Sequence, residues 1–147
     1  MAIISLVNRK GGVGKSTISI NLASGLAIHE SRKKNSKPVL LIDMDAQLSA
    51  TITAMGGGFG EDFVPVITSD NNYPQALENG YGASESLIVD SLIPRKRGQK
   101  VKLFRTNKAR MEGLEASLKQ REEADFQLTY FLEPIQDDYS YIIIDNP

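Results

Sequence analysis

Cysteine and tryptophan are absent from this sequence, histidine occurs once, and no apolar run is long. Without cysteine the chain can form neither a disulfide nor a thiolate metal site, and we expect it in a reducing compartment, the cytoplasm. A membrane-spanning helix needs about 20 consecutive apolar residues, so we expect no membrane span. The formal net charge of −1 provides no overall basic field. Any contact with nucleic acid therefore has to come from a local patch.

The length of 147 residues suits one domain with a substantial core. Four short apolar runs predict buried strands, at residues 2–7, 39–42, 101–104 and 141–144. The helix predicted over residues 16–29 has apolar side chains at helical spacing: Ile18, Leu22, Ala23, Leu26 and Ala27. A strand, a helix and a second strand in this order favour a parallel crossover. The predicted fold class is α/β, a mostly parallel sheet with helices on both faces.

Other segments have weaker patterns. Residues 56–83 contain clusters of glycine, asparagine and aspartate, which predict a long surface excursion. A short helix is expected within residues 84–92. A long amphipathic helix is predicted over residues 108–135, with a polar, solvent-facing stretch in its middle.

A glycine-rich segment carries the strongest chemical signal. Residues 10–17 read Lys-Gly-Gly-Val-Gly-Lys-Ser-Thr, between a predicted strand and a predicted helix. Glycines let backbone N–H groups approach phosphate oxygens, and the helix N-terminus adds unpaired donors and partial positive charge. The alternative, a glycine-rich turn beside solvated lysines, requires three glycines, two lysines and a serine to coincide by chance.

We therefore predict a phosphate-binding loop made of Lys10, Gly11, Gly12, Val13, Gly14, Lys15, Ser16 and Thr17. Lys15 is expected to bridge the β- and γ-phosphates of a nucleotide, and the Ser16 hydroxyl to ligate Mg²⁺. Thr17 is expected to reach the α-phosphate.

Acidic residues follow two of the predicted strands. Asp43 and Asp45 come after the strand at 39–42, and Asp145 comes after the strand at 141–144. Parallel sheets bind ligands at the carboxyl ends of their strands, and a carboxylate there can hold Mg²⁺ or its waters. Taken alone, each acid is also compatible with a helix cap or a turn.

The phosphate loop departs from the general pattern, because Arg9 stands where that pattern has its first glycine. With Lys10 directly before the paired glycines, the loop instead resembles the deviant Walker A loop of the ParA/MinD family of P-loop ATPases. Residues 43–47 resemble the family's second motif, Asp-x-Asp-Pro-Gln, with Ala46 for the usual proline and Leu48 for the glycine that usually follows. Gln47 points to the partition branch of the family, and residues 141–147 resemble its Walker B strand.

This resemblance implies a P-loop NTPase-like fold with ATP and Mg²⁺ as cofactors. It implies that Lys10 reaches the nucleotide of the partner in an ATP-dependent homodimer, as an arginine finger does. By the same resemblance Asp45 would position the attacking water, whereas Asp43 and Asp145 would act on Mg²⁺ or its waters. Lys10, Lys15 and Asp45 would thus be the catalytic residues.

The implied biological role is partition of plasmids or chromosomes. Non-specific DNA and a ParB-like or centromere-binding activator would be the partners. The resemblance covers the first half of the family's ATPase domain, so residues 1–147 are interpreted as a single nucleotide-binding domain, the N-terminal part of a longer ATPase truncated after the Walker B strand.

Three alternatives remain open from the sequence. A membrane-cycling ATPase of the MinD kind needs a C-terminal amphipathic helix. An iron–sulfur carrier or nitrogenase-like reductase of the same superfamily needs cysteines. A non-hydrolysing fragment would act as a binding module only.

A basic cluster lies within 16 residues: Arg95, Lys96, Arg97, Lys100, Lys102, Arg105, Lys108 and Arg110. It is interpreted either as a solvated face or as a footprint on the DNA phosphate backbone. Aromatic residues are scarce in it, so stacking on single strands is not expected.

Overall fold

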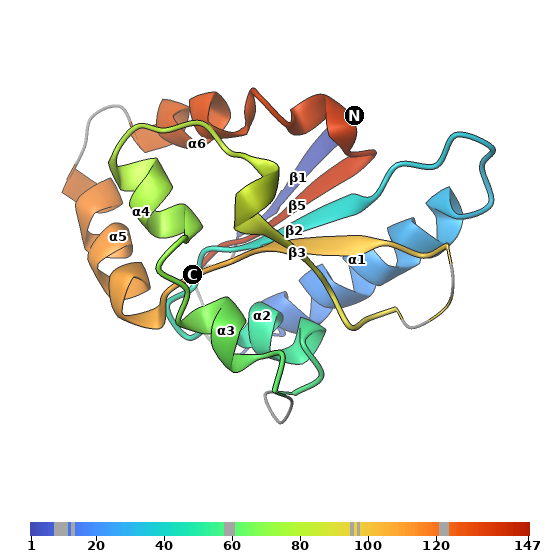
Figure 1. Cartoon of the computed structure of the whole chain (residues 1–147), viewed down its shortest axis with the longest axis horizontal. Coiled ribbons are helices and arrows are strands. Elements are labelled where there is room, and N and C mark those ends of the chain that lie inside the picture. Colours follow the sequence, from blue (N-terminus) through green and yellow to red (C-terminus); the bar gives the residue numbers. More distant parts are fainter. Residues whose placement is uncertain (8–11, 13, 58–60, 95, 97, 121–123) are drawn as a thin grey trace.

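A five-stranded sheet with the strand order β1-β5-β2-β4-β3 organises the computed structural model (Figure 1). The structure describes the whole chain except residues 8–11, 13, 58–60, 95, 97 and 121–123. The strands are β1 (Ala2–Leu6), β2 (Val39–Asp43), β3 (Ile88–Asp90), β4 (Val101–Phe104) and β5 (Tyr141–Asp145). All neighbouring pairs are parallel except β3 and β4, which are antiparallel. The mostly parallel α/β sheet is thus confirmed.

Helices cover both faces of the sheet, as predicted (Figure 1). They are α1 (Lys15–Glu30), α2 (Ser49–Ala54), α3 (Val64–Ile67), α4 (Tyr73–Glu78), α5 (Lys108–Gln120) and α6 (Ala124–Leu132), with short 3₁₀ turns at Glu85–Leu87 and Gln136–Asp138. Because successive strand residues point to opposite faces of the sheet, β2 contributes side chains to two hydrophobic cores, one on each face. Leu40 and Ile42 pack with residues of α4, α5 and α6, whereas Val39 and Leu41 pack with residues of α1, α2 and α3.

The first strand is less buried than predicted. Among the described strands β1 pairs with β5 alone and forms one edge of the sheet, and Ile3 is 46% exposed. The buried central position belongs to β5, which pairs with both β1 and β2. An apolar run identifies a strand but not its neighbours, so the sequence pattern could not distinguish edge from centre.

The predicted surface excursion at 56–83 is also corrected. The described part of this segment contains α3 and α4, and it contributes buried side chains to both cores: Phe63, Val66, Tyr73, Leu77 and Ala83. Asn72 caps α4, because its side-chain oxygen accepts the Gln75 N–H at 3.0 Å. Two of the residues that predicted turns, Asn72 and Asn79, therefore stand at the start and the end of a helix that packs in the core.

Three element predictions need smaller corrections. The short helix expected within 84–92 is one 3₁₀ turn followed by strand β3. The long helix expected over 108–135 is two helices, α5 and α6, and residues 121–123 between them lie outside the described residues. In α1, Ala23 and Ala27 are buried as expected of the apolar face, whereas Ile18 is 54% exposed and the polar Ser19 and Glu30 are buried.

An aromatic cluster ties the helical layer to the sheet. The rings of Tyr73, Phe104 and Phe131 pack with centroid separations of 5.4 to 6.4 Å. The Tyr73 hydroxyl is buried and donates to the main-chain oxygen of Asp43 at 2.6 Å. This bond joins α4 to the carboxyl end of β2, where the candidate site lies.

Replacing Tyr73 by phenylalanine should lower the free energy of unfolding by about 1–2 kcal/mol, because the buried Asp43 carbonyl loses its donor. Denaturant titration measures this change. The matched control is Tyr130→Phe, which removes the same hydroxyl from an exposed ring on α6 and should leave the midpoint unchanged. Equal midpoints for Tyr73→Phe and wild type would contradict the structural role of this bond.

Candidate nucleotide-binding site

The start of α1 has the geometry of an anion-binding turn. Gly14 is the N-cap residue with φ 84°, and Gly12 has φ 73°, a left-handed conformation that favours glycine. Among the residues that the structure describes, no side chain caps the helix and its first turn holds no acidic residue, which suits the binding of an anion by its N–H groups and partial positive charge. Of the eight predicted loop residues, Lys10, Gly11 and Val13 lie outside the described residues.

Lys15, Ser16 and Thr17 form the first turn of α1. Lys15 and Ser16 are half-buried, and Thr17 is exposed. The chain enters this turn from the carboxyl end of β1, whose Leu6 pairs with Asp145 of β5. The first turn of α1 and Asp145 are therefore at the same edge of the sheet.

Parallel register brings two of the predicted acids side by side. Asp43 at the end of β2 is the pairing partner of Asp145 at the end of β5. Both are buried. Ser19 Oγ donates to Asp145 Oδ1 at 2.8 Å, whereas Asp145 Oδ2 has no hydrogen-bond partner among the described residues.

Asp43 has a more complete set of donors. Its Oδ2 accepts the Thr51 N–H at 2.8 Å, and its Oδ1 accepts the Asp45 N–H at 3.2 Å. Burial raises the pKa of Asp43 to about 7, and the neighbouring Asp145 carboxylate adds to this effect, although the two N–H bonds oppose it. At neutral pH this carboxyl group is therefore close to the midpoint of its titration.

Asp45 lies in the loop after β2 and is half-buried. Its Oδ1 accepts the Gln47 N–H at 2.8 Å, which closes a local turn, and its main-chain oxygen accepts the Leu48 N–H at 2.9 Å. Leu48 itself has φ 54° and is fully buried. This loop leaves one Asp45 carboxylate oxygen outside the turn.

Comparison with known proteins agrees with this geometry. A family model described as an AAA domain matches residues 1–147. The chain belongs to this family. It is homologous to the chromosome partitioning protein ParA of Myxococcus xanthus, with 36% identity over 148 residues that cover 99% of this chain and 44% of the relative. The resemblance to ParA proteins that the motifs indicated is thus confirmed.

Two solved structures share the fold. The pNOB8 ParA protein bound to nonspecific DNA superimposes with a TM-score of 0.67 at 27% identity, covering 99% of this chain and 46% of that one. Cobyrinic acid a,c-diamide synthase from Mycobacterium smegmatis with bound ATP analog and magnesium gives a TM-score of 0.66 at 26% identity, with coverages of 99% and 50%. The P-loop NTPase fold is therefore confirmed, and the ParA-like chain spans about half the length of the proteins that it matches.

The acids of this ParA-like chain suit a hard cation such as Mg²⁺. Asp145 Oδ2 is a buried carboxylate oxygen without a partner among the described residues, and Asp43 lies beside it. The described residues contain no cluster of three or more His, Cys, Asp or Glu that could enclose a metal by itself. A Mg²⁺ ion here would thus need oxygens from water or phosphate, which is how this ion usually binds.

Sequence reasoning missed two residues that support the ParA-like site. Ser19 holds Asp145, and Tyr73 holds the main chain of Asp43. A signal for Ser19 existed, since it lies one helical turn after Lys15 on the face that also carries Ala23 and Ala27. The partner of Tyr73 lies 30 residues away, and no local pattern indicates it.

No described helix of the chain has both the length and the apolar character required to cross a membrane.

The raised pKa of Asp43 predicts a pH-dependent stability. Since its pKa is near 3.8 when unfolded and about 7 when folded, the folded state binds the extra proton between these values. Stability should therefore fall as pH rises from about 4 to about 7, by up to roughly 4 kcal/mol from this group. Asp43→Asn should flatten the dependence, measured by urea unfolding at several pH values.

The matched control for this experiment is Asp70→Asn, which removes an exposed carboxylate from the loop before α4. In this variant the free energy of unfolding should change with pH at the wild-type slope. A slope in Asp43→Asn that equals the wild-type slope over the same pH range would show that Asp43 does not titrate there.

Proposed function

We propose that this chain is the nucleotide-binding part of a ParA-like partition ATPase, in which binding and hydrolysis of ATP with Mg²⁺ switch the protein between monomer and dimer. The observation that carries this proposal is the convergence of the α1 N-terminus, Asp43 and Asp145 at one edge of the sheet. Homology to a chromosome partitioning protein supports the role in segregation, and a solved relative with bound ATP analog and magnesium supports the cofactors.

In this proposal each residue has a role that suits its position. Lys15 and the N–H groups of the first turn of α1 bind phosphate oxygens, and Gly12 and Gly14 let the backbone adopt the necessary turn. Ser16, Asp43 and Asp145 hold Mg²⁺ or its waters, and Ser19 fixes the orientation of Asp145. When bound, Mg²⁺ supplies positive charge that offsets charge on the reacting phosphoryl group.

Hydrolysis requires a water placed in line with the γ-phosphate. Asp45 suits this role, since its backbone is fixed by the turn with Gln47 while the side chain is only half-buried. Lys10 would donate its charge to the partner's nucleotide, so that turnover depends on dimerisation. The complete assembly would act in the cytoplasm on non-specific DNA, with a ParB-like or centromere-binding protein as activator.

Lys15→Ala tests the phosphate-binding loop. Loss of the ammonium group should abolish binding of MgATP, because no other described cation lies on the first turn of α1. Isothermal titration calorimetry measures this on the purified chain. Lys108→Ala, on the exposed first turn of α5, is the control and should bind as wild type does. Unchanged affinity in Lys15→Ala would refute the assignment of the loop.

Lys10→Ala separates binding from the dimerisation switch. In the full-length gene product this variant should keep ATP affinity within about twofold and lose ATP-dependent dimerisation and turnover, because its cation acts on the partner subunit. Sedimentation with ATP and a phosphate-release assay measure the two properties. Wild-type turnover per subunit in Lys10→Ala would show that the lysine does not act in trans.

A further inference from the structure

Positive charge is concentrated in two short segments of the chain. Residues 31–37 and 95–102 contain nine of the 17 lysines and arginines and no aspartate or glutamate. The rest of the sequence has eight cations against all 18 acids. The modest net charge of −1 therefore conceals a strong internal separation of charge.

The fold brings these two segments together. The first is the turn between α1 and β2, and the second is the loop between β3 and β4, and both lie at the same end of the molecule (Figure 1). A Cβ atom added to Gly98 would lie 4.0 Å from the Cβ of Ser31. The Val39 N–H donates to the Lys100 carbonyl at 3.0 Å. We call the described cations of these segments the amino-end basic surface: Arg32, Lys33, Lys34, Lys37, Lys96, Lys100 and Lys102.

The basic cluster seen in the sequence is not one face. Because β4 runs parallel to β2, Lys96 and Lys100 lie at the amino end of the sheet, whereas Lys108 and Arg110 lie on α5, beyond the carboxyl end of β4. The turn at residues 31–37, and not the start of α5, lies beside the segment that carries Lys96 and Lys100. Arg95 and Arg97 belong to the loop by sequence and lie outside the described residues.

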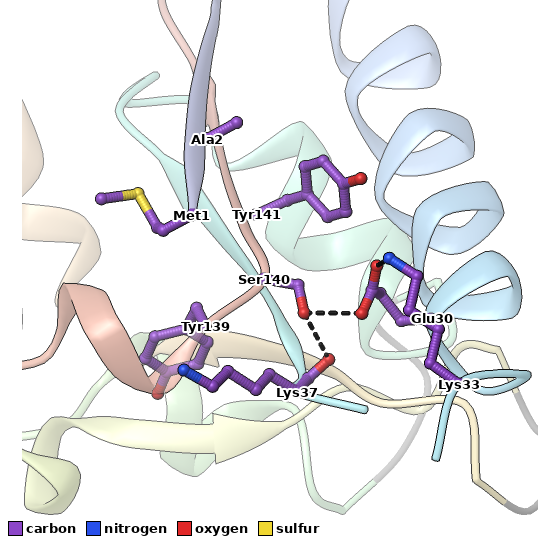
Figure 2. A pocket seen from close by; sticks show the side chains of 8 residues that line it. All are labelled: Met1, Ala2, Glu30, Lys33, Lys37, Tyr139, Ser140 and Tyr141. Carbon is purple, nitrogen blue, oxygen red and sulfur yellow. Dashed lines mark hydrogen bonds and ion pairs between the residues drawn. The ribbon is translucent and has the colours of Figure 1, made fainter. Parts of the chain in front are cut away.

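Acids near this surface neutralise only part of it. Lys33 pairs with buried Glu30, which also accepts a hydrogen bond from Ser140 Oγ at 2.8 Å (Figure 2). The Lys102 Nζ atom lies 3.7 Å from Asp90 Oδ1. Within the part of the chain that the structure describes, no ion pair is recorded for the exposed side chains of Arg32, Lys34, Lys96 and Lys100.

We propose that the amino-end basic surface is a docking site for the phosphate backbone of duplex DNA. The proposal rests on the proposed partition function, and it adds a surface for the DNA partner on this part of the chain. Lysines and arginines without interspersed acids match the regular negative charge of a duplex, which carries about one charge per 1.7 Å of axis. The two segments contain no aromatic residue, so stacking on single strands is not available.

This surface can be occupied together with the nucleotide site. β2 starts beside Lys100 and ends at Asp43, so about 13 Å of strand separates the two sites. DNA at the amino end leaves the phosphate loop and its edge of the sheet uncovered. The related pNOB8 ParA was solved with nonspecific DNA, which is the kind of contact that charge without base-reading side chains provides.

The test compares two charge-matched double variants of the purified chain. Lys34→Glu with Lys100→Glu changes the amino-end basic surface, and Lys108→Glu with Arg110→Glu makes the same change in net charge on α5. Fluorescence anisotropy with a short duplex of arbitrary sequence measures affinity over a range of salt. Unfolding midpoints and calorimetric MgATP binding verify that both variants fold and keep the nucleotide site.

The first variant should bind duplex at least roughly tenfold more weakly than wild type at about 0.1 M salt, with a salt slope smaller by about 2. The control variant should remain within about threefold of wild type, and two unrelated duplexes should bind wild type equally. Equal losses in both variants, no loss in the first, or no binding by wild type would overturn the proposal, and MgATP binding would still support the ATPase assignment. Binding to phosphatidylserine vesicles in place of duplex would overturn it as well.

Discussion

β5 hydrogen-bonds to β1 on one side and to β2 on the other, over five residues on each side, and the site depends on this register. Because all three strands are parallel, the loops that follow them open at the same edge of the sheet. Asp145 lies between Leu6, which precedes the predicted phosphate loop in the sequence, and Asp43, which leads into the loop of Asp45. Segments separated by more than 100 positions in the chain thus become neighbours.

The same register has an electrostatic cost. It places two buried carboxyl groups next to each other, and burial with like charge opposes ionisation of Asp43. Hydrogen bonds from Thr51, Asp45 and Ser19 orient the carboxylates but bring no positive charge. A cation bound at this edge would relieve the repulsion, which fits the Mg²⁺ site proposed above.

The motifs allowed the sheet type, the start of α1 and the position of the acids to be predicted, because these depend on short local patterns. Residues 39–42 and 141–144 were predicted as strands since their apolar runs are short and bounded by turns or acids. Strand order was not predictable in this way. β1 and β5 have similar compositions, and only long-range pairing makes one an edge and the other the centre.

The errors at 56–83 and around Ile18 have different physical causes. In the described part of 56–83, Asn72 and Asn79 are the N-cap and C-cap residues of α4, and sparse apolar residues such as Phe63, Val66 and Tyr73 provide the burial. In α1 the small residues Ser19, Ala23 and Ala27 are buried, with Ser19 bonded to Asp145, so a pattern of apolar residues includes the exposed Ile18 and misses Ser19. The supporting contacts of Ser19 and Tyr73 become visible only in three dimensions.

Leu48 gives the loop after β2 a particular stiffness. It adopts a left-handed backbone conformation, where the resembling family usually has glycine, and its side chain is buried in the core cluster that includes Tyr73. A glycine would let this loop rearrange without removing any side chain from the core. With leucine, any large movement of the Asp45 turn has to bring an apolar side chain into water, which costs about 2 kcal/mol. Burial of Leu48 in the hydrophobic core thus opposes movement of the loop that carries Asp45. If the full cost is reached in the transition state, this loop exchanges between conformations up to about thirtyfold more slowly.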